Sequence, residues 1–188
     1  MSLTSQPGPS FRDFFRFGAS YLINAGNAEF YTLGRQAMIA GFKSSGLAPG
    51  QLVLVPAFIC QSVVQELVAS GFNVHFYDVT LDLNVKSEPL FELAARVEAR
   101  AVLIVHYFGV MHPDSIQLIR ELSKQLIVGE DRCHGYCGHG FQLDLKLDSA
   151  FAFYSLRKVY PVKSGGVLIK NSAEAPIYSN VNKSNFYL

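Results

Sequence analysis

The residue with the most distinctive chemistry is Lys158, which lies within the segment Ser149–Lys170. An alternating apolar run leads into Ser155-Leu156-Arg157-Lys158, and Gly165-Gly166 opens a second apolar run after a proline-containing turn. We expect Lys158 at the end of a buried strand, where an ammonium is poorly hydrated and the neutral amine is available for Schiff-base chemistry. Because a lysine beside a turn is usually a solvated surface cation, this assignment depends on what other segments place around it.

Two adjacent carboxylates form a second candidate group. The apolar run Ile127-Val128-Gly129 continues into Glu130-Asp131-Arg132-Cys133-His134. Carboxylates at the end of a hydrophobic strand are costly to bury unless each has a charged or hydrogen-bonding partner. A protonated heterocyclic nitrogen is one such partner, so we interpret this segment as a candidate binding site.

Glycines and short side chains mark two further turns between a strand and a helix. Gly34, in Leu33-Gly34-Arg35-Gln36-Ala37, would let the backbone approach an anion at the start of a helix, and Arg35 could add positive charge. Any tight turn favours glycine, so this signal is weak on its own. The segment Pro56–Ser62, which contains Cys60, could line a pocket or cap a helix. His106 ends an apolar run, and we interpret it as a buried structural histidine.

A cluster of cysteines and histidines could suggest zinc, since Cys133 and His134 are followed by Cys137 and His139. In common structural zinc sites the second ligand pair lies further away in the sequence. We therefore predict no metal and interpret the cysteines as small core or loop residues.

These candidates alternate with a regular series of expected elements. Strands are expected at Phe30–Leu33, Leu52–Val55, Phe72–Val79, Ala101–Tyr107 and Leu126–Val128. Helices are expected at Arg35–Lys43, Gln61–Ala69, Ser87–Ala99 and Ser115–Lys124. Strands without polar alternation, separated by helices, predict an α/β fold with three layers and a mostly parallel central sheet. In such sheets ligands bind at the carboxyl ends of the strands, where the candidate residues fall.

Composition excludes several classes of protein. The 188 residues are 49% hydrophobic with a formal net charge of +1, and the basic residues are scattered, which argues against a nucleic-acid partner. No apolar run approaches the roughly 20 residues of a membrane span. Three cysteines and the lack of a secretory leader pattern favour a reducing, cytoplasmic location.

The first residues are predicted separately from the fold. Residues 1–10 are expected to be a flexible leader. The segment Phe11–Asn24 places most of its aromatic residues on one helical face. It could be an interfacial membrane helix, but we favour a helix that makes packing or subunit contacts.

Six segments together resemble the DegT/DnrJ/EryC1/StrS group of fold-type-I pyridoxal-phosphate enzymes, best known as sugar aminotransferases. In chain order they are GRQA, LVLVPAFICQSV, FNVHFYDV, LIVHYFG, LIVGEDRCHG and FAFYSLRKVYPVKSGGVLI. The resemblance implies that Lys158 forms the Schiff base with pyridoxal 5'-phosphate and later transfers a proton. It implies that Asp131 pairs with the pyridine nitrogen, so that the ring stays protonated, and that His134 lies near the ring.

The resemblance also implies where the rest of the cofactor binds and which partners take part. The phosphate is expected at Gly34, Arg35 and Gln36, with Ser155 contributing a hydroxyl, and Cys60 stands where an aromatic commonly stacks on the ring. The implied substrates are a nucleotide-linked keto sugar and an amino donor such as glutamate, and the implied assembly is a homodimer.

Departures from the family pattern leave alternatives open. The phosphate turn, usually Ser-Gly-Thr, is here Gly34-Arg35-Gln36. We expect residues 11–171 to form the cofactor-binding large domain and residues 172–188 to be a truncated tail in place of a C-terminal domain. The alternatives are a chain that binds pyridoxal phosphate but is catalytically incomplete, and a non-enzymatic α/β module.

Overall fold

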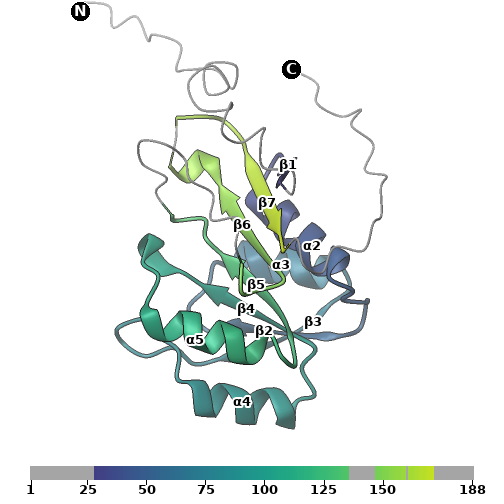
Figure 1. Cartoon of the computed structure of the whole chain (residues 1–188). Helices are drawn as coiled ribbons and strands as arrows, with labels where there is room; N and C mark the ends of the chain where they lie inside the picture. Colours follow the sequence, from purple (N-terminus) through teal and green to yellow (C-terminus); the bar gives the residue numbers. More distant parts are fainter. Residues whose placement is uncertain (1–27, 136–146, 160, 172–188) are drawn as a thin grey trace, which may run out of the picture.

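The core of the protein is one seven-stranded sheet with the order β1-β7-β6-β5-β4-β2-β3 (Figure 1). A computed structural model describes residues 28–135, 147–159 and 161–171. The strands are β1 (Ala28–Tyr31), β2 (Leu52–Pro56), β3 (Asn73–Tyr77), β4 (Ala101–Val105), β5 (Ile127–Asp131), β6 (Phe151–Ser155) and β7 (Gly166–Lys170). The helices are α2 (Gly34–Ser44), α3 (Gln61–Ala69), α4 (Ser87–Arg96) and α5 (Pro113–Leu122), with short 3-10 turns η1 (Tyr107–Gly109) and η2 (Leu156–Lys158).

Five neighbouring strands on one side of the sheet are parallel, and both pairings of β7 are antiparallel. Strands β3, β2, β4, β5 and β6 run in the same direction. Strand β7 runs against β6 on one side and β1 on the other. The mostly parallel α/β sheet predicted from the sequence is therefore confirmed.

Helices cover both faces of this sheet, which gives the three layers (Figure 1). Apolar side chains of α2 and α3 pack with alternate residues of the strands, including Val55, Leu103 and Phe153. The intervening residues, such as Leu54, Val102 and Val128, pack with α4 and α5 on the opposite face. Because successive side chains of a strand point to opposite faces, strands covered on both sides show the continuous apolar runs seen in the sequence.

Phe151 packs between α2 and the sheet. Its ring is fully buried and meets Phe42 edge to face at a centroid distance of 4.9 Å. A Cβ atom on Gly41 or Gly129 would lie 2.3 or 2.5 Å from this ring, so both glycines make room for it. Burying such a side chain stabilises the fold by about 2 kcal/mol.

Element boundaries differ from the predictions in three informative places. Strand β5 continues through Glu130 and Asp131, whereas the apolar pattern ended it at Val128. Helix α5 begins at Pro113 rather than Ser115, because proline at the first helical position needs no hydrogen-bond partner. Lys158 lies in η2 rather than at the end of a strand.

Some predictions concern residues outside the described part of the chain. These are the leader, the helix expected at Phe11–Asn24, the tail at 172–188, and Cys137 and His139 of the zinc alternative. Within the described part, none of the helices combines the length and apolar character that a membrane crossing needs.

Candidate functional site

The start of α2 lies directly against the ends of two other segments. A Cβ atom on Gly34 would be 3.2 Å from Cys133 Sγ, from Ser155 Cβ and from the carbonyl oxygen of Tyr154. Gly34 therefore has no room to spare for a side chain, and its lack of one lets the helix start meet β6 and the segment after β5. The first amide N–H groups of a helix have no partner inside it, so this junction is suited to an anion.

Glycines at the start of β7 hold this junction in place. The N–H of Gly165 donates to the carbonyl of Thr32 at 2.8 Å, and the N–H of Leu156 donates to the carbonyl of Gly165 at 2.8 Å. A Cβ atom on Gly166 would lie 2.4 Å from the Leu33 carbonyl oxygen. The pair that the sequence singled out thus connects the Gly34 turn to the turn that contains Lys158.

Asp131 ends β5 on the sheet face covered by α2 and α3. Asp131 is 9% exposed, and its Oδ1 accepts a hydrogen bond from the Cys133 N–H at 2.9 Å. Burial, together with the charge of Asp131 and a hydrogen bond to it, raises the pKa of the Cys133 thiol well above its usual range. The site thus offers a fixed carboxylate beside a neutral thiol.

Lys158 and His134 come together across the ends of β6 and β5. Lys158 Nζ lies 3.2 Å from His134 Nε2. Among the described residues Lys158 is exposed, so the prediction that it lies in a buried environment is wrong. Its proximity to an imidazole, rather than burial, is the observed feature that bears on its reactivity.

A turn after β4 holds His134 from the other side. The Phe108 ring stacks on the His134 ring at 6.2 Å with an interplanar angle of 19°, and Phe108 adopts a left-handed backbone with φ 54°. A Cβ atom on Gly109 would lie 2.7 Å from the His134 carbonyl oxygen. Sequence reasoning missed this contact, because nothing in the run Tyr107-Phe108-Gly109 indicates which segment it touches.

Tyr107, in the same turn, reaches the loop after β2. Its hydroxyl donates to the Phe58 carbonyl at 2.7 Å, and the two rings lie 5.7 Å apart. Burial and the negative charge of Asp131 raise the pKa of Tyr107 to about 12, so the phenol remains a hydrogen-bond donor at neutral pH. The Tyr107 contacts therefore connect the two loops that carry the exposed rings of Phe58 and Phe108.

The side chains of Arg35 and Gln36 have other partners. Arg35 Nε pairs with Glu66 of α3 at 3.0 Å, and Gln36 Oε1 accepts from the N–H of Leu33 at 3.2 Å. The Arg35 side chain therefore links α2 to α3, and the Gln36 side chain caps the start of α2. Any contribution of these residues to an anion site at the helix start would come from their backbone.

Cys60 directly precedes α3 and is exposed. Its Sγ lies 3.0 Å from Ser62 Oγ. This hydrogen bond, backbone N–H groups of the helix start and the charge of Lys158 lower the pKa of the thiol. The positive charge of Lys158 therefore helps to stabilise the thiolate form of Cys60.

His106 is confirmed as a buried, hydrogen-bonded histidine. It is 4% exposed, and its Nε2 lies 2.7 Å from Glu130 Oε2. Glu130 and His106 belong to the sheet face opposite Asp131, so the two neighbouring carboxylates have different surroundings.

Comparison with known proteins adds one decisive observation. The profile of the DegT/DnrJ/EryC1/StrS aminotransferase family matches residues 2–178. The chain belongs to this family. A sequence comparison with curated proteins finds no match.

Several solved structures share the fold of this chain. A family aminotransferase from Brucella abortus superposes with a TM-score of 0.65 at 21% identity, covering 86% of this chain and 47% of the other. For 3-amino-5-hydroxybenzoic acid synthase the values are 0.66, 23%, 86% and 43%. For a Helicobacter pylori aminotransferase involved in the biosynthesis of pseudoaminic acid they are 0.67, 17%, 92% and 47%. The chain thus spans just under half the length of these relatives.

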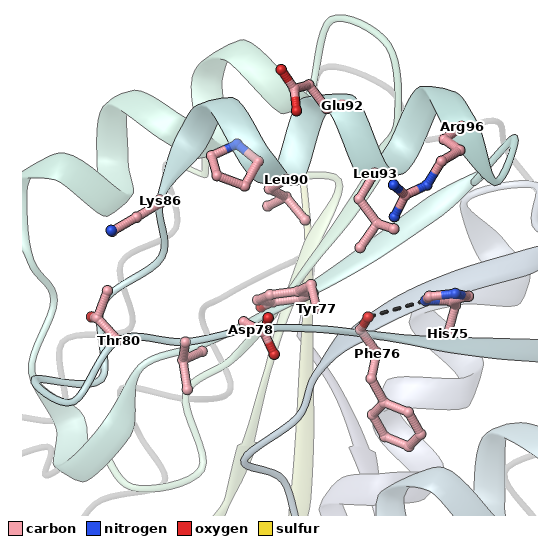
Figure 2. A pocket seen from close by; sticks show the side chains of 12 residues that line it. His75, Phe76, Tyr77, Asp78, Thr80, Lys86, Leu90, Glu92, Leu93 and Arg96 are labelled. Atoms are coloured by element: carbon pink, nitrogen blue, oxygen red, sulfur yellow. Dashed lines mark hydrogen bonds between the residues drawn. The ribbon is translucent and has the colours of Figure 1, made fainter.

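A groove of about 580 Å³ lies elsewhere on this family member, between β3 and α4 (Figure 2). Leu90 and Leu93 extend from α4 towards the strand, whereas Phe76 points to the other side of it. None of the residues predicted for the site lines this groove. The candidate site is therefore the junction of strand ends, not this groove.

Proposed function

We propose that the junction around Gly34, Asp131 and Lys158 binds pyridoxal phosphate and that the chain belongs to a transferase acting on a nucleotide-linked keto sugar. The observation that supports this best is the convergence of three chemically different groups at neighbouring strand ends. They are a helix start with no side chain at Gly34, a fixed carboxylate at Asp131, and an amine at Lys158 beside His134. Residues 11–171 would form the cofactor-binding domain.

The residues present fit this cofactor. The first amides of α2 have no partner within the helix, and Ser155 lies against Gly34, so an anion bound at this helix start could also reach the Ser155 hydroxyl. Arg35, Gln36 and Cys60 would complete the surroundings of the cofactor. When bound, pyridoxal phosphate supplies an electron sink that stabilises negative charge on a substrate carbon.

The roles of the chain's own residues follow from their chemistry. Lys158 would hold the cofactor covalently. Once released, its amine would accept a proton at Nζ and return it. His134 Nε2, at 3.2 Å, can accept a proton from that amine or return one. The Asp131 carboxylate would keep a proton on the ring nitrogen, because an adjacent negative charge favours the protonated heterocycle.

Cofactor binding and amino transfer are separate expectations, because the chain spans less than half the length of its structural relatives. A chain that binds pyridoxal phosphate without turnover is the alternative. With turnover, we expect glutamate as amino donor and a homodimer in the cytoplasm.

The test of the proposed function starts with the cofactor. Pyridoxal phosphate added to the chain should give a visible absorption band, and borohydride reduction should leave a label that maps to Lys158. Lys158→Ala should remove the band, whereas Lys163→Ala, a change of an exposed lysine after the same turn, should retain it. A label on another lysine, or no label, would falsify the assignment of Lys158.

A further inference from the structure

A buried charge cluster lies on the sheet face opposite Asp131. We call it the Glu130 cluster, and it comprises Glu130, Arg132, His106, Ser149 and Tyr154. Glu130 Oε2 accepts from Arg132 Nε at 3.0 Å and from the second guanidinium nitrogen at 2.8 Å, and it lies 2.7 Å from His106 Nε2. Ser149 Oγ donates to Glu130 Oε1, and Arg132 reaches the Tyr154 hydroxyl at 3.2 Å.

The cluster is almost completely removed from solvent. Glu130 is 1% exposed and Arg132 is 8% exposed. Burial alone would raise the pKa of Glu130, but the hydrogen bond from His106 and the charge of Arg132 outweigh it and hold the pKa below its usual value. A buried ion pair gives little net stability compared with apolar residues of the same volume, so its value is more readily sought in the geometry that it fixes.

That geometry includes the backbone on both sides of Asp131. The N–H of His106 donates to the Asp131 carbonyl at 3.0 Å, and the N–H of Arg132 donates to the Phe153 carbonyl at 3.0 Å. Glu130 and Arg132 flank Asp131 in the chain, and their side chains meet on the far face of the sheet. The ion pair thus joins the two residues on either side of Asp131, whose own side chain lies on the opposite face of the sheet.

We propose that Glu130 and Arg132 are positioning residues that hold the Asp131 carboxylate in the orientation that a protonated ring nitrogen requires. This inference rests on the proposed function, because it assigns the task of Asp131 to cofactor binding. The exposed pair of Arg120 and Asp148, 3.0 Å apart with side chains 56% and 40% exposed, offers a comparison without that task.

A double-mutant cycle separates positioning from stability. Pyridoxal phosphate affinity is measured by absorbance for the wild type, Glu130→Gln, Asp131→Asn and the double variant, with unfolding followed by circular dichroism in each. We expect Glu130→Gln to weaken affinity by about tenfold in the wild-type background. It should have no further effect once Asp131 is asparagine, because Glu130 acts only through the contact between the Asp131 carboxylate and the ring nitrogen.

Two further variants distinguish a loss of positioning from a loss of folding. Ser149→Ala removes one hydrogen bond to Glu130 but leaves the ion pair, and it should weaken affinity by a few-fold in a chain that remains folded. Asp148→Asn breaks the exposed pair and should leave affinity unchanged.

The outcomes are distinct. An equal loss of affinity from Glu130→Gln in both backgrounds, or none in either, overturns the positioning role while leaving the proposed function intact. A wild type that does not bind pyridoxal phosphate, or an Asp131→Asn variant that binds it equally well, overturns the proposed role of Asp131 and this inference with it.

Discussion

Lys158 Nζ and His134 Nε2 lie 3.2 Å apart, although their residues follow different strands of the sheet. An uncharged imidazole nitrogen at this distance can accept a hydrogen bond from the lysine ammonium. The same contact gives a route for the proton that the lysine must lose before it attacks a carbonyl carbon.

We therefore expect His134→Ala to slow the reaction of Lys158 with pyridoxal phosphate by about tenfold or more. His134 is exposed, so the free energy of unfolding should change little. Rapid-mixing absorbance measures the rate, and His112→Ala, a change of a histidine at the start of α5, is the control. An unchanged rate would place His134 outside the proton transfer.

Gly166→Ala should disturb the end of the site where we propose that the phosphate binds. The new Cβ atom would lie 2.4 Å from the Leu33 carbonyl oxygen, so the turn before Gly34 must move. We expect a loss of about 1–3 kcal/mol in the free energy of unfolding and weaker pyridoxal phosphate binding.

The matched control for this change is Gly46→Ala. Gly46 has φ +89° with open space around it, so alanine there introduces backbone strain alone. It should cost about 1–2 kcal/mol without affecting cofactor affinity. Equal effects of the two variants on affinity would contradict the role assigned to Gly166.

Cys60 and Cys133 should differ in reactivity. The lowered pKa of Cys60 gives it more thiolate at neutral pH, whereas the raised pKa of the buried Cys133 keeps it protonated. Brief treatment with iodoacetamide, followed by peptide mass spectrometry, should label Cys60 first. Ser62→Ala should slow this labelling several-fold, because the hydrogen bond that stabilises the thiolate is lost. Denatured chain, in which both should react alike, is the reference.

Glu130 should make stability depend on pH. Its pKa in the folded protein lies below the ordinary value of 4.5, so the stabilisation is complete above that value and is lost as the pH falls through the folded-state pKa. At neutral pH, Glu130→Gln should lower the free energy of unfolding by about 3 kcal/mol, because Arg132 is left buried without its anion. The difference from the wild type should shrink in acid, as urea unfolding at several pH values would show. A difference that does not change with pH would contradict an ionised Glu130.

The architecture was predictable because it depends on local patterns. Helix α3 matches its expected range from Gln61 to Ala69, and the continuous apolar strands gave the parallel sheet. Strand β5 was predicted too short, because its last two residues are carboxylates, and two of the partners that allow Glu130 to be buried, His106 and Ser149, lie 24 and 19 positions away in the sequence. Such partners cannot be identified from spacing alone.

The candidate site was predictable in membership more than in geometry. Asp131 and Ser155 end β5 and β6 as expected, whereas Gly34 begins α2 and Lys158 lies in η2, just after β6. The stacking of Phe108 on His134 and the pairing of Arg35 with Glu66 could not be foreseen, because both depend on how separate loops and helices meet.

The antiparallel pairing of β1 with β7 has a consequence for the order of folding. It joins residues from opposite ends of the described chain, as in the ion pair of Lys170 with Glu29, which are 141 positions apart, whereas Lys158 and His134 are only 24 apart. Closing the longer loop costs more chain entropy and is slower. Lys158 and His134 can therefore meet before the β1–β7 pairing forms, and amides of β1 should gain protection from hydrogen exchange after those of β5 and β6.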